Sequence, residues 1–200
     1  ISALSQNLLE MPNLTSEQCQ QAIQIIDSRS NNLLQFIDSY SDLAKLPLPN
    51  VQLFDLSALL QQIKALVKQV KLDVSAPLMI KADKGQIEQV LINLIKNAKE
   101  AQVSSHLDDT SQNAEIEIKV ESNNQHVIIQ VLDQGCGIAN SDNLFVPFYT
   151  TKEKGSGIGL ALSRQIINNH HGELTLANRQ PLTSDKTMKG AVATISLNVR

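Results

Sequence analysis

The sequence predicts an α+β protein: a two-layer sandwich with a mixed, mostly antiparallel sheet and helices on one face, preceded by an α-helical hairpin. Three observations support this prediction. Hydrophobic residues recur at steps of three and four through residues 1–44 and stop at a proline-containing segment. Beyond it, strand-like segments that are neighbours in sequence favour antiparallel pairing. Amphipathic helical segments separate the strands and would bury their apolar faces on one side of the sheet.

The first 50 residues are predicted to form the hairpin and a linker. Apolar residues of 1–11 are spaced by three or four, and Pro12-Asn13 interrupts them. Thr15 or Ser16 can cap a second helix, and two prolines within 45–50 end it. We interpret the seam as half of a four-helix bundle completed by a second chain; the alternative is an ordinary helix pair lying on the following domain. The seam consists of Cys19, Ile23, Ile26, Ser30, Leu33, Ile37, Tyr40 and Ala44.

The segment 51–103 begins the second domain. Asp55 can cap an amphipathic helix over 55–70, and residues 78–80 read as a short apolar strand. Asp83 can cap the next helix, which runs to about residue 103, and Gln86 is spaced to close a capping box.

The remaining segments complete the sheet and add one helix. Strands are predicted over 115–120, 126–132, 174–176 and 190–199. A last helix is predicted over 157–169, terminated by Gly172.

Two asparagines, Asn93 and Asn97, interrupt the apolar face of the helix that Asp83 begins. Being four residues apart, they lie on one face of that helix, one turn from each other. Asparagine is a poor helix former, and an amide beside a buried stripe costs free energy unless it is satisfied. An amide oxygen is a suitable ligand for Mg²⁺. The alternative is two partly exposed residues at the edge of the stripe; the glycine-rich segment downstream favours the metal site.

The segment 133–160 has two glycine-rich turns on either side of a basic loop. Glycine lets backbone amides approach a ligand closely, and amides that open a helix bind anions. The segment therefore predicts a nucleotide site. Its residues are Asp133, Gly135 and Gly137 at the first turn, Lys152 and Lys154 in the loop, and Gly155, Gly157 and Gly159 at the second turn.

Composition narrows the class of protein. Hydrophobic residues make up 42% of the 200 residues and aromatic residues 3%, so the core is aliphatic. A net charge of −3 argues against a nucleic-acid partner. No apolar run is long enough to span a bilayer, so membrane attachment is expected only through segments outside this sequence. Two isolated cysteines favour a reducing compartment.

Four motifs resemble those of sensor histidine kinases of two-component systems. The stretch EQVLINLIKNAKEA (88–101) resembles the N box, DQGCG (133–137) the first glycine box, FVPFYTTK (145–152) the F box and GSGIGLALSRQII (155–167) the second glycine box. A single glycine motif is weak evidence, whereas four in order and spacing are specific. The match covers residues 51–200, and residues 16–49 resemble the second helix of the dimerisation and histidine-phosphotransfer domain.

The resemblance implies a Bergerat-type fold that binds ATP and Mg²⁺. Asp133 would accept a hydrogen bond from the adenine amino group, and Asn97, with Asn93 beside it, would hold the metal. Asn93, Asn97 and Lys152 would carry the catalytic roles. The nucleotide-binding residues would be Asn97, Asp133, Gly135, Gly137, Lys152, Lys154, Gly157, Gly159 and Leu160, with Thr194 supporting Asp133 from a neighbouring strand.

The chain departs from the family at three points, one of which, Gly172-Glu173 where relatives often have two glycines, is interpreted as structural. Many relatives carry a basic residue where this chain has Glu100, and the roles of Lys96 and Lys99 stay open. The family's phosphoacceptor His is also missing, because none of the four histidines lies in the hairpin. We therefore expect a fragment whose residues 1–50 are a truncated dimerisation hairpin and linker, and whose residues 51–200 are the kinase catalytic domain.

The implied function is transfer of the ATP γ-phosphate to a histidine outside this fragment, for relay to an aspartate of a response regulator. We expect the fragment to bind ATP without autophosphorylating, to form a homodimer through its N-terminal helices, and to act in the cytoplasm, free or as part of a membrane-anchored sensor. One alternative is another ATPase of the same fold; gyrase-type and chaperone-type enzymes use a Glu base where this chain has Asn93, which cannot act as a base. The other is a dimerisation module without kinase activity.

Overall fold

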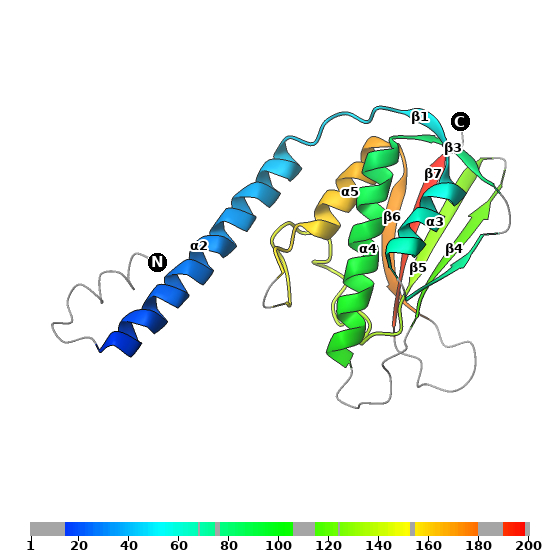
Figure 1. Ribbon diagram of the computed structural model, residues 1–200. Helices are drawn as coiled ribbons and strands as arrows, with labels where there is room; N and C mark the ends of the chain where they lie inside the picture. Colours follow the sequence, from blue (N-terminus) through cyan, green and yellow to red (C-terminus); the bar gives the residue numbers. More distant parts are fainter. Residues whose placement is uncertain are drawn as a thin grey trace.

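The structure, a computed structural model, describes residues 15–67, 69–74, 77–105, 115–123, 125–152, 155–179 and 190–198. A long helix leads into an α/β domain, and it extends away from that domain in Figure 1. The first predicted helix, over residues 1–11, lies outside the described residues. No helix in the described ranges has the length and hydropathy that a membrane crossing needs.

Helix α2 (Ser16–Ala44) begins at Thr15, one of the two predicted caps. The N–H of Gln18 donates to Thr15 Oγ1 (3.3 Å), and the N–H of Thr15 donates to Gln18 Oε1 (3.1 Å). Within this single chain three apolar residues of the seam are open to solvent, since Ile23, Leu33 and Ile37 are 64%, 52% and 52% exposed. Pairing of α2 with a second chain stays a prediction.

The linker after α2 is fastened to the start of α4 (Lys84–Ser105). The N–H of Asn50 donates to Asp83 Oδ2 (2.9 Å), and Gln86 Nε2 donates to the Pro47 carbonyl (3.0 Å). Asp83 caps α4 as predicted, because its Oδ1 accepts from the N–H of Gln86 (3.1 Å). The predicted capping box is wrong: the Gln86 side chain is used by the linker, and the N–H of Asp83 donates instead to His170 Nε2 (3.0 Å).

These contacts set the charge state of Asp83. Burial alone would raise the pKa of its carboxyl. The N–H groups of Gln86, Asn50 and Gly85, together with the nearby His170, outweigh burial and lower that pKa from its ordinary value of 3.8. The carboxylate form is therefore favoured by the folded chain.

The predicted helix over 55–70 is shorter than expected. Asp55 caps α3 (Leu56–Leu66) as predicted, with Oδ1 accepting from the N–H groups of Ser57 and Ala58. Val67 leaves the helical region (φ −118°, ψ 94°), and Val70 begins a strand, β2 (Val70–Asp73). The β-branched side chains at these positions suit a strand better than a helix end.

Two short strands form a separate pair beside the main sheet. β1 (Gln52–Asp55) was not predicted, and it pairs antiparallel with β3 (Met79–Ala82), which includes most of the predicted strand over 78–80.

The main sheet confirms the predicted mixed, mostly antiparallel arrangement. Its order is β2-β4-β5-β7-β6, with β4 (Ile116–Ser122) parallel to β2 and the other neighbours antiparallel. The remaining strands are β5 (His126–Leu132), β6 (Glu173–Asn178) and β7 (Ala191–Asn198).

Helices α3, α4 and α5 (Gly159–Asn169) lie along one side of this sheet (Figure 1). Alternate strand residues face them, so that paired positions such as Ile129 and Ile195 are fully buried. The core is aliphatic, as predicted. Its fully buried members include Leu56, Leu59, Leu60, Ile63, Ile87, Leu91, Ile95, Ile116, Ile118 and Ile166.

The predicted helix over 157–169, terminated by Gly172, ends at Asn169, three residues before that glycine. His171 takes the left-handed conformation (φ 56°), and the N–H of Gly172 donates to the Ile167 carbonyl (2.9 Å). Gly172 is needed for a different reason: an added Cβ would lie 2.4 Å from the Ser196 carbonyl oxygen, so glycine lets the turn approach β7.

Candidate functional site

Asp133 follows the last residue of β5 and is 6% exposed. Its Oδ1 accepts two hydrogen bonds, from the N–H of Gly135 (2.8 Å) and from the N–H of Ala191 at the start of β7 (3.0 Å). Within the described part of the chain, no residue donates to Oδ2. One carboxylate oxygen therefore holds the backbone, while the other is available to a ligand.

The turn after Asp133 is shaped by its glycines and by Asn178 at the end of β6. An added Cβ on Gly135 would lie 2.7 Å from the carbonyl carbon of Ala101 in α4. Gly137 has φ +76°, which favours glycine. Asn178 Oδ1 accepts from the N–H of Ile138 (2.6 Å), and Asn178 Nδ2 donates to the Ile138 carbonyl (3.0 Å). Sequence reasoning missed Asn178, since its partner is 40 residues away.

The backbone of Asp133 is supported from the β6–β7 side. Arg179 Nη1 donates to the Asp133 carbonyl (3.0 Å), and Gly190 lies so close to this carbonyl that an added Cβ would be 2.3 Å from its oxygen. Thr194, predicted to support Asp133, does not do so. It pairs in register with Gln130, three residues before Asp133, and the support comes from the N–H of Ala191.

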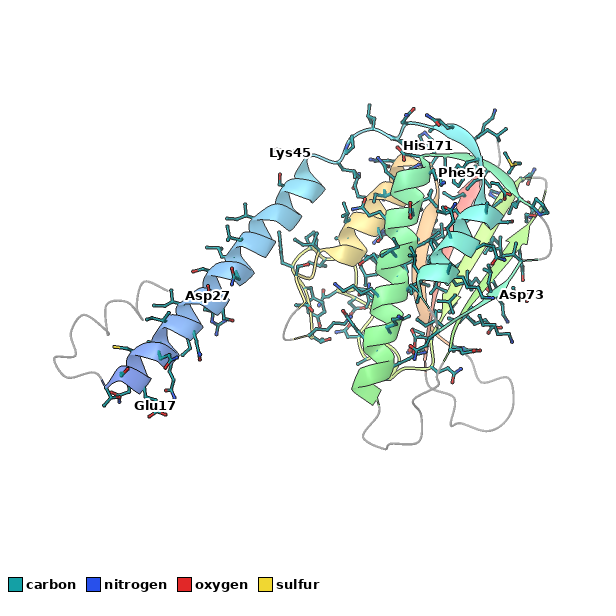
Figure 2. The ribbon with its side chains drawn as sticks, in the orientation of Figure 1. Glu17, Asp27, Lys45, Phe54, Asp73 and His171 are labelled. Atoms are coloured by element: carbon teal, nitrogen blue, oxygen red, sulfur yellow. The ribbon has the colours of Figure 1, made fainter. Side chains whose placement is uncertain are left out.

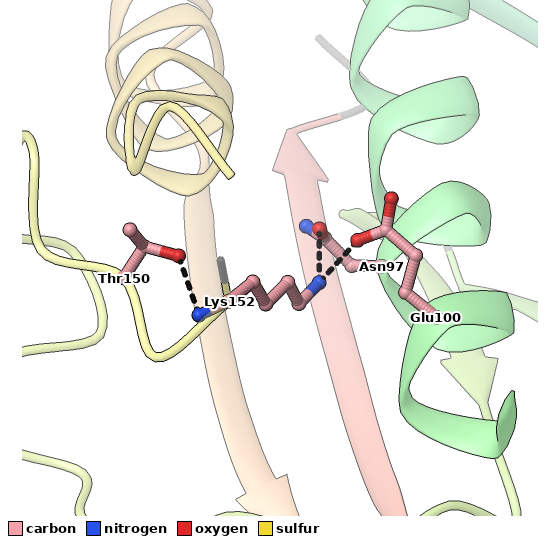
Figure 3. Close-up of polar contacts among 4 residues, drawn as sticks. All are labelled: Asn97, Glu100, Thr150 and Lys152. Carbon is pink, nitrogen blue, oxygen red and sulfur yellow. Dashed lines mark hydrogen bonds and ion pairs between the residues drawn. The ribbon is translucent and has the colours of Figure 1, made fainter. Parts of the chain in front are cut away.

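The two asparagines of α4 have different neighbours. Asn97 Oδ1 accepts from Lys152 Nζ (3.3 Å), which also forms an ion pair with Glu100 (Figure 3). Asn93 Nδ2 instead donates to Ser163 Oγ in α5 (2.8 Å). The structure therefore brings two of the predicted site residues, Asn97 and Lys152, into contact, and places Asn93 against the start of α5.

The second glycine turn, around Gly157, leads directly into the start of α5. Gly157 has φ +67°, and an added Cβ there would lie 2.5 Å from the carbonyl carbon of Phe148, whose N–H donates to the Gly157 carbonyl (2.9 Å). Ile158 stands at the cap position and provides no side-chain hydrogen bond. The first N–H groups of α5, including those of Gly159 and Leu160, therefore lack a side-chain cap and can bind an anion. Lys154 lies outside the described residues.

Both halves of the site meet on α4. Gly135 packs against Ala101, four residues after Asn97, so the acidic turn and the Asn97 side chain lie one helical turn apart. In the described ranges, no group of three or more His, Cys, Asp or Glu side chains could hold a metal ion. The donors present, an amide oxygen from Asn97 and a carboxylate from Glu100, are of the kind Mg²⁺ binds when phosphate and water complete its shell.

Comparison with known proteins gives one family. Residues 82–200 match the sequence profile described as "Histidine kinase-, DNA gyrase B-, and HSP90-like ATPase". Sporulation kinase B of Bacillus subtilis is 29% identical over 171 residues, covering 80% of this chain and 37% of that protein. The histidine-protein kinase AtoS of Escherichia coli is 38% identical over 102 residues, covering 50% of this chain and 16% of that protein. The chain thus spans less than half the length of these curated relatives.

Solved structures share the fold. The catalytic domain of histidine kinase ThkA is 28% identical, with a TM-score of 0.61, covering 75% of this chain and 96% of that one. The structure of ThkA in complex with response regulator protein TrrA covers 100% of this chain and 57% of that one, at 24% identity and a TM-score of 0.67.

Proposed function

Because the chain belongs to the family of histidine kinase-, DNA gyrase B- and HSP90-like ATPases, we propose that it is the ATP-binding catalytic region of a two-component sensor histidine kinase. It would bind Mg-ATP and position the γ-phosphate for attack by a histidine outside this sequence, for relay to an aspartate of a response regulator. One observation carries the proposal: the carboxylate of the buried Asp133 is hydrogen-bonded through Oδ1 alone, and the turn that follows it packs on α4 at Ala101, one helical turn from Asn97, whose Oδ1 already accepts from a cationic group.

Asp133 would select adenine. Its free oxygen can accept a hydrogen bond from the amino group of adenine, whereas guanine presents a carbonyl oxygen at the same place and would leave two acceptors facing each other. The lack of side chains at Gly135 and Gly137 lets the turn pack closely against Ala101 of α4 and against Asn178, which fixes the backbone beside the proposed adenine position.

The phosphates would lie between α4, the loop and the start of α5. The amides of Gly157, Gly159 and Leu160 and the ammonium of Lys152 supply positive charge there, and Lys154 is proposed to add to it. Asn97 Oδ1 would hold Mg²⁺. Asn93 Oδ1 is proposed to assist, since its Nδ2 is used by Ser163.

Transfer of a phosphoryl group needs placement and charge neutralisation more than covalent participation by the protein. The bound cation would neutralise phosphate charge. Residues of this chain would fix the adenine end at Asp133 and the phosphate end at Lys152 and the start of α5. With both ends fixed, the terminal phosphate is oriented for an incoming nucleophile.

The comparisons support a kinase over a gyrase-type ATPase. The curated relatives and the solved structures are histidine kinases, and Asn93 occupies the position where those ATPases would carry a general base. A response regulator is proposed as the partner on the precedent of ThkA with TrrA. A homodimer through α2 is proposed because its apolar seam is exposed in the single chain.

The test is calorimetric titration with ATP and GTP, with and without Mg²⁺, on the wild type and on Asp133→Asn. The substitution keeps size and shape but sets an N–H₂ donor against the adenine amino group, or loses the bond to Gly135. We expect ATP affinity to fall by about 10- to 100-fold, the loss expected for a hydrogen bond to a charged group. The matched control is Asp73→Asn, on an exposed residue of β2 (Figure 2).

Unchanged ATP affinity in Asp133→Asn would refute the assignment, as would equal affinity of the wild type for GTP. Incubation with γ-labelled ATP separates the activities. We expect no stable label on this chain, because the acceptor histidine lies elsewhere; sustained hydrolysis of ATP would instead favour the gyrase-type alternative.

A further inference from the structure

Asn97, Glu100 and Lys152 form a compact polar cluster at the mouth of the site (Figure 3). Lys152 Nζ donates to Asn97 Oδ1 at 3.3 Å and to Glu100 Oε2 in an ion pair. Both acceptors project from α4 and are three residues apart, so they lie on the same face of the helix. Two oxygens, one amide and one carboxylate, thus hold one cationic group.

Stability does not explain this cluster. The side chains of Lys152 and Glu100 are 38% and 40% exposed, and ion pairs in such positions contribute little to folding. Glu100 also places a negative charge beside the oxygen that would hold the metal. Without a cation nearby, that charge would repel the phosphates of a nucleotide.

We infer that Asn97 and Glu100 form a two-oxygen cation seat, which Lys152 fills when no nucleotide is bound and the divalent cation of Mg-ATP fills when one is. This inference rests on the proposed function. Glu100 then binds the metal, directly or through one of its waters, and Lys152 is released to the phosphates. Amide and carboxylate oxygens are the ligands that Mg²⁺ prefers, and it is usually held by one or two carboxylates plus phosphates.

The exchange needs movement of the lysine side chain only. The N–H of Lys152 donates to Thr150 Oγ1 (3.1 Å), and its carbonyl accepts from the N–H of Gly155 (3.3 Å), so both backbone polar groups of the lysine are hydrogen-bonded. The ammonium is at the end of a flexible four-carbon stem. Rotation of the side chain alone can therefore move the charge from the seat toward the phosphates.

Exchange of the two cations also balances charge. In the nucleotide-free state Lys152 neutralises Glu100. After exchange, the divalent ion neutralises Glu100 and part of the triphosphate, and Lys152 neutralises more of it. Metal binding and movement of the lysine to the phosphates are thereby coupled. Glu100 couples them, and it stands at a position that is often basic in relatives.

The test measures metal affinity rather than activity. Binding of Mn²⁺ to the chain saturated with ATP is followed by electron paramagnetic resonance, and ATP affinity is titrated over a series of Mg²⁺ concentrations. Glu100→Gln keeps the shape and removes the charge. We expect it to weaken Mn²⁺ binding to the ATP complex by about 10-fold, the lower end of the range for losing even an outer-shell partner of a metal site. ATP affinity without metal should be unchanged or tighter.

Two further variants make the result decisive. Glu121→Gln, on an exposed residue of β4, is the matched control and should leave Mn²⁺ binding unchanged. Lys152→Met removes the competing cation and should leave Mn²⁺ binding unchanged or tighter. Equal Mn²⁺ affinity in Glu100→Gln and the wild type, or weaker Mn²⁺ binding in Lys152→Met, would overturn the inference. Failure of the wild type to bind ATP with or without metal would instead refute the proposed function.

Discussion

Gly159 is the first residue of α5 and lies directly against the side chain of Asn93. We therefore expect Gly159→Ala to lower the free energy of unfolding of the wild type but not of a variant that lacks the Asn93 side chain. In Gly159→Ala the new Cβ would lie 2.5 Å from Asn93 Oδ1 and 3.0 Å from Cγ and Nδ2. Asn93 is not free to move away, because its Nδ2 donates to Ser163 Oγ, and Ser163 is 2% exposed.

The magnitude follows from two opposing effects. Displacing Asn93 breaks a hydrogen bond to a buried hydroxyl, which costs about 1–3 kcal/mol. Replacing glycine by alanine in a helix contributes at most about 1 kcal/mol in return. Gly159→Ala should therefore lower the free energy of unfolding by about 0.5–2 kcal/mol in the wild type. With Asn93→Ala already present, the same change should be neutral or raise that free energy by up to about 1 kcal/mol.

Hydrogen exchange at amides of β5 and β7 measures this double-mutant cycle, since these central strands open only when the α/β domain unfolds. The signal is then independent of α2. Gly85→Ala is the control: the nearest atom to its added Cβ is at an ordinary 3.5 Å, so it should be neutral or stabilising in both backgrounds. An equal cost of Gly159→Ala with and without Asn93 would show that the Asn93 contact does not restrict the start of α5.

Three other predictions concern the turn after β5 and the start of α4. Asn178→Ala removes both hydrogen bonds to Ile138 and should cost about 1 kcal/mol in urea denaturation, reflecting their exposure; an unchanged midpoint would show that the turn holds without them. Gly190→Ala combines a left-handed φ of 143° with a backbone clash at Asp133, and should cost roughly 2–4 kcal/mol; wild-type stability would contradict the close approach. Because the pKa of Asp83 is lowered on folding, its stabilising contribution is complete above about pH 5 and is lost as pH falls through its folded pKa. The stability difference between wild type and Asp83→Asn should therefore shrink from pH 5 to pH 3, and a difference constant over that range would refute the linkage.

The sequence was sufficient for features whose signal is local. Capping residues at Thr15 and Asp55 begin their helices as predicted, because the side chain and the amides it binds are within three residues. The motifs that the sequence singled out around Asn97 and Lys152 also lie in contact in the folded chain. The spacing of these motifs along the sequence was informative because each glycine turn is joined directly to a strand or helix. That strand or helix fixes the direction in which the turn projects.

What the sequence did not predict depends on contacts between distant segments. Asn178 looks like an ordinary strand-end residue until β6 is placed beside the turn 40 residues earlier. Gln86 fits a capping box by spacing, yet the linker carbonyl at Pro47 binds its side chain. Thr194 was misplaced because the register between β5 and β7, which only the folded sheet defines, puts Ala191 beside Asp133.

The fastening of the linker determines where the molecule can bend. Pro47 and Asn50 are hydrogen-bonded to the start of α4, and Leu46 packs against the core, while the N–H of Lys45 still bonds to Ser41 of α2. Apart from the contacts of α2 with α5, the joint is held least at the backbone between Lys45 and Leu46. Since α2 is about 40 Å long, a rotation of about 10° at that joint would sweep its far end through about 7 Å. A change of one dihedral angle would thus become a displacement large enough to alter which surfaces meet.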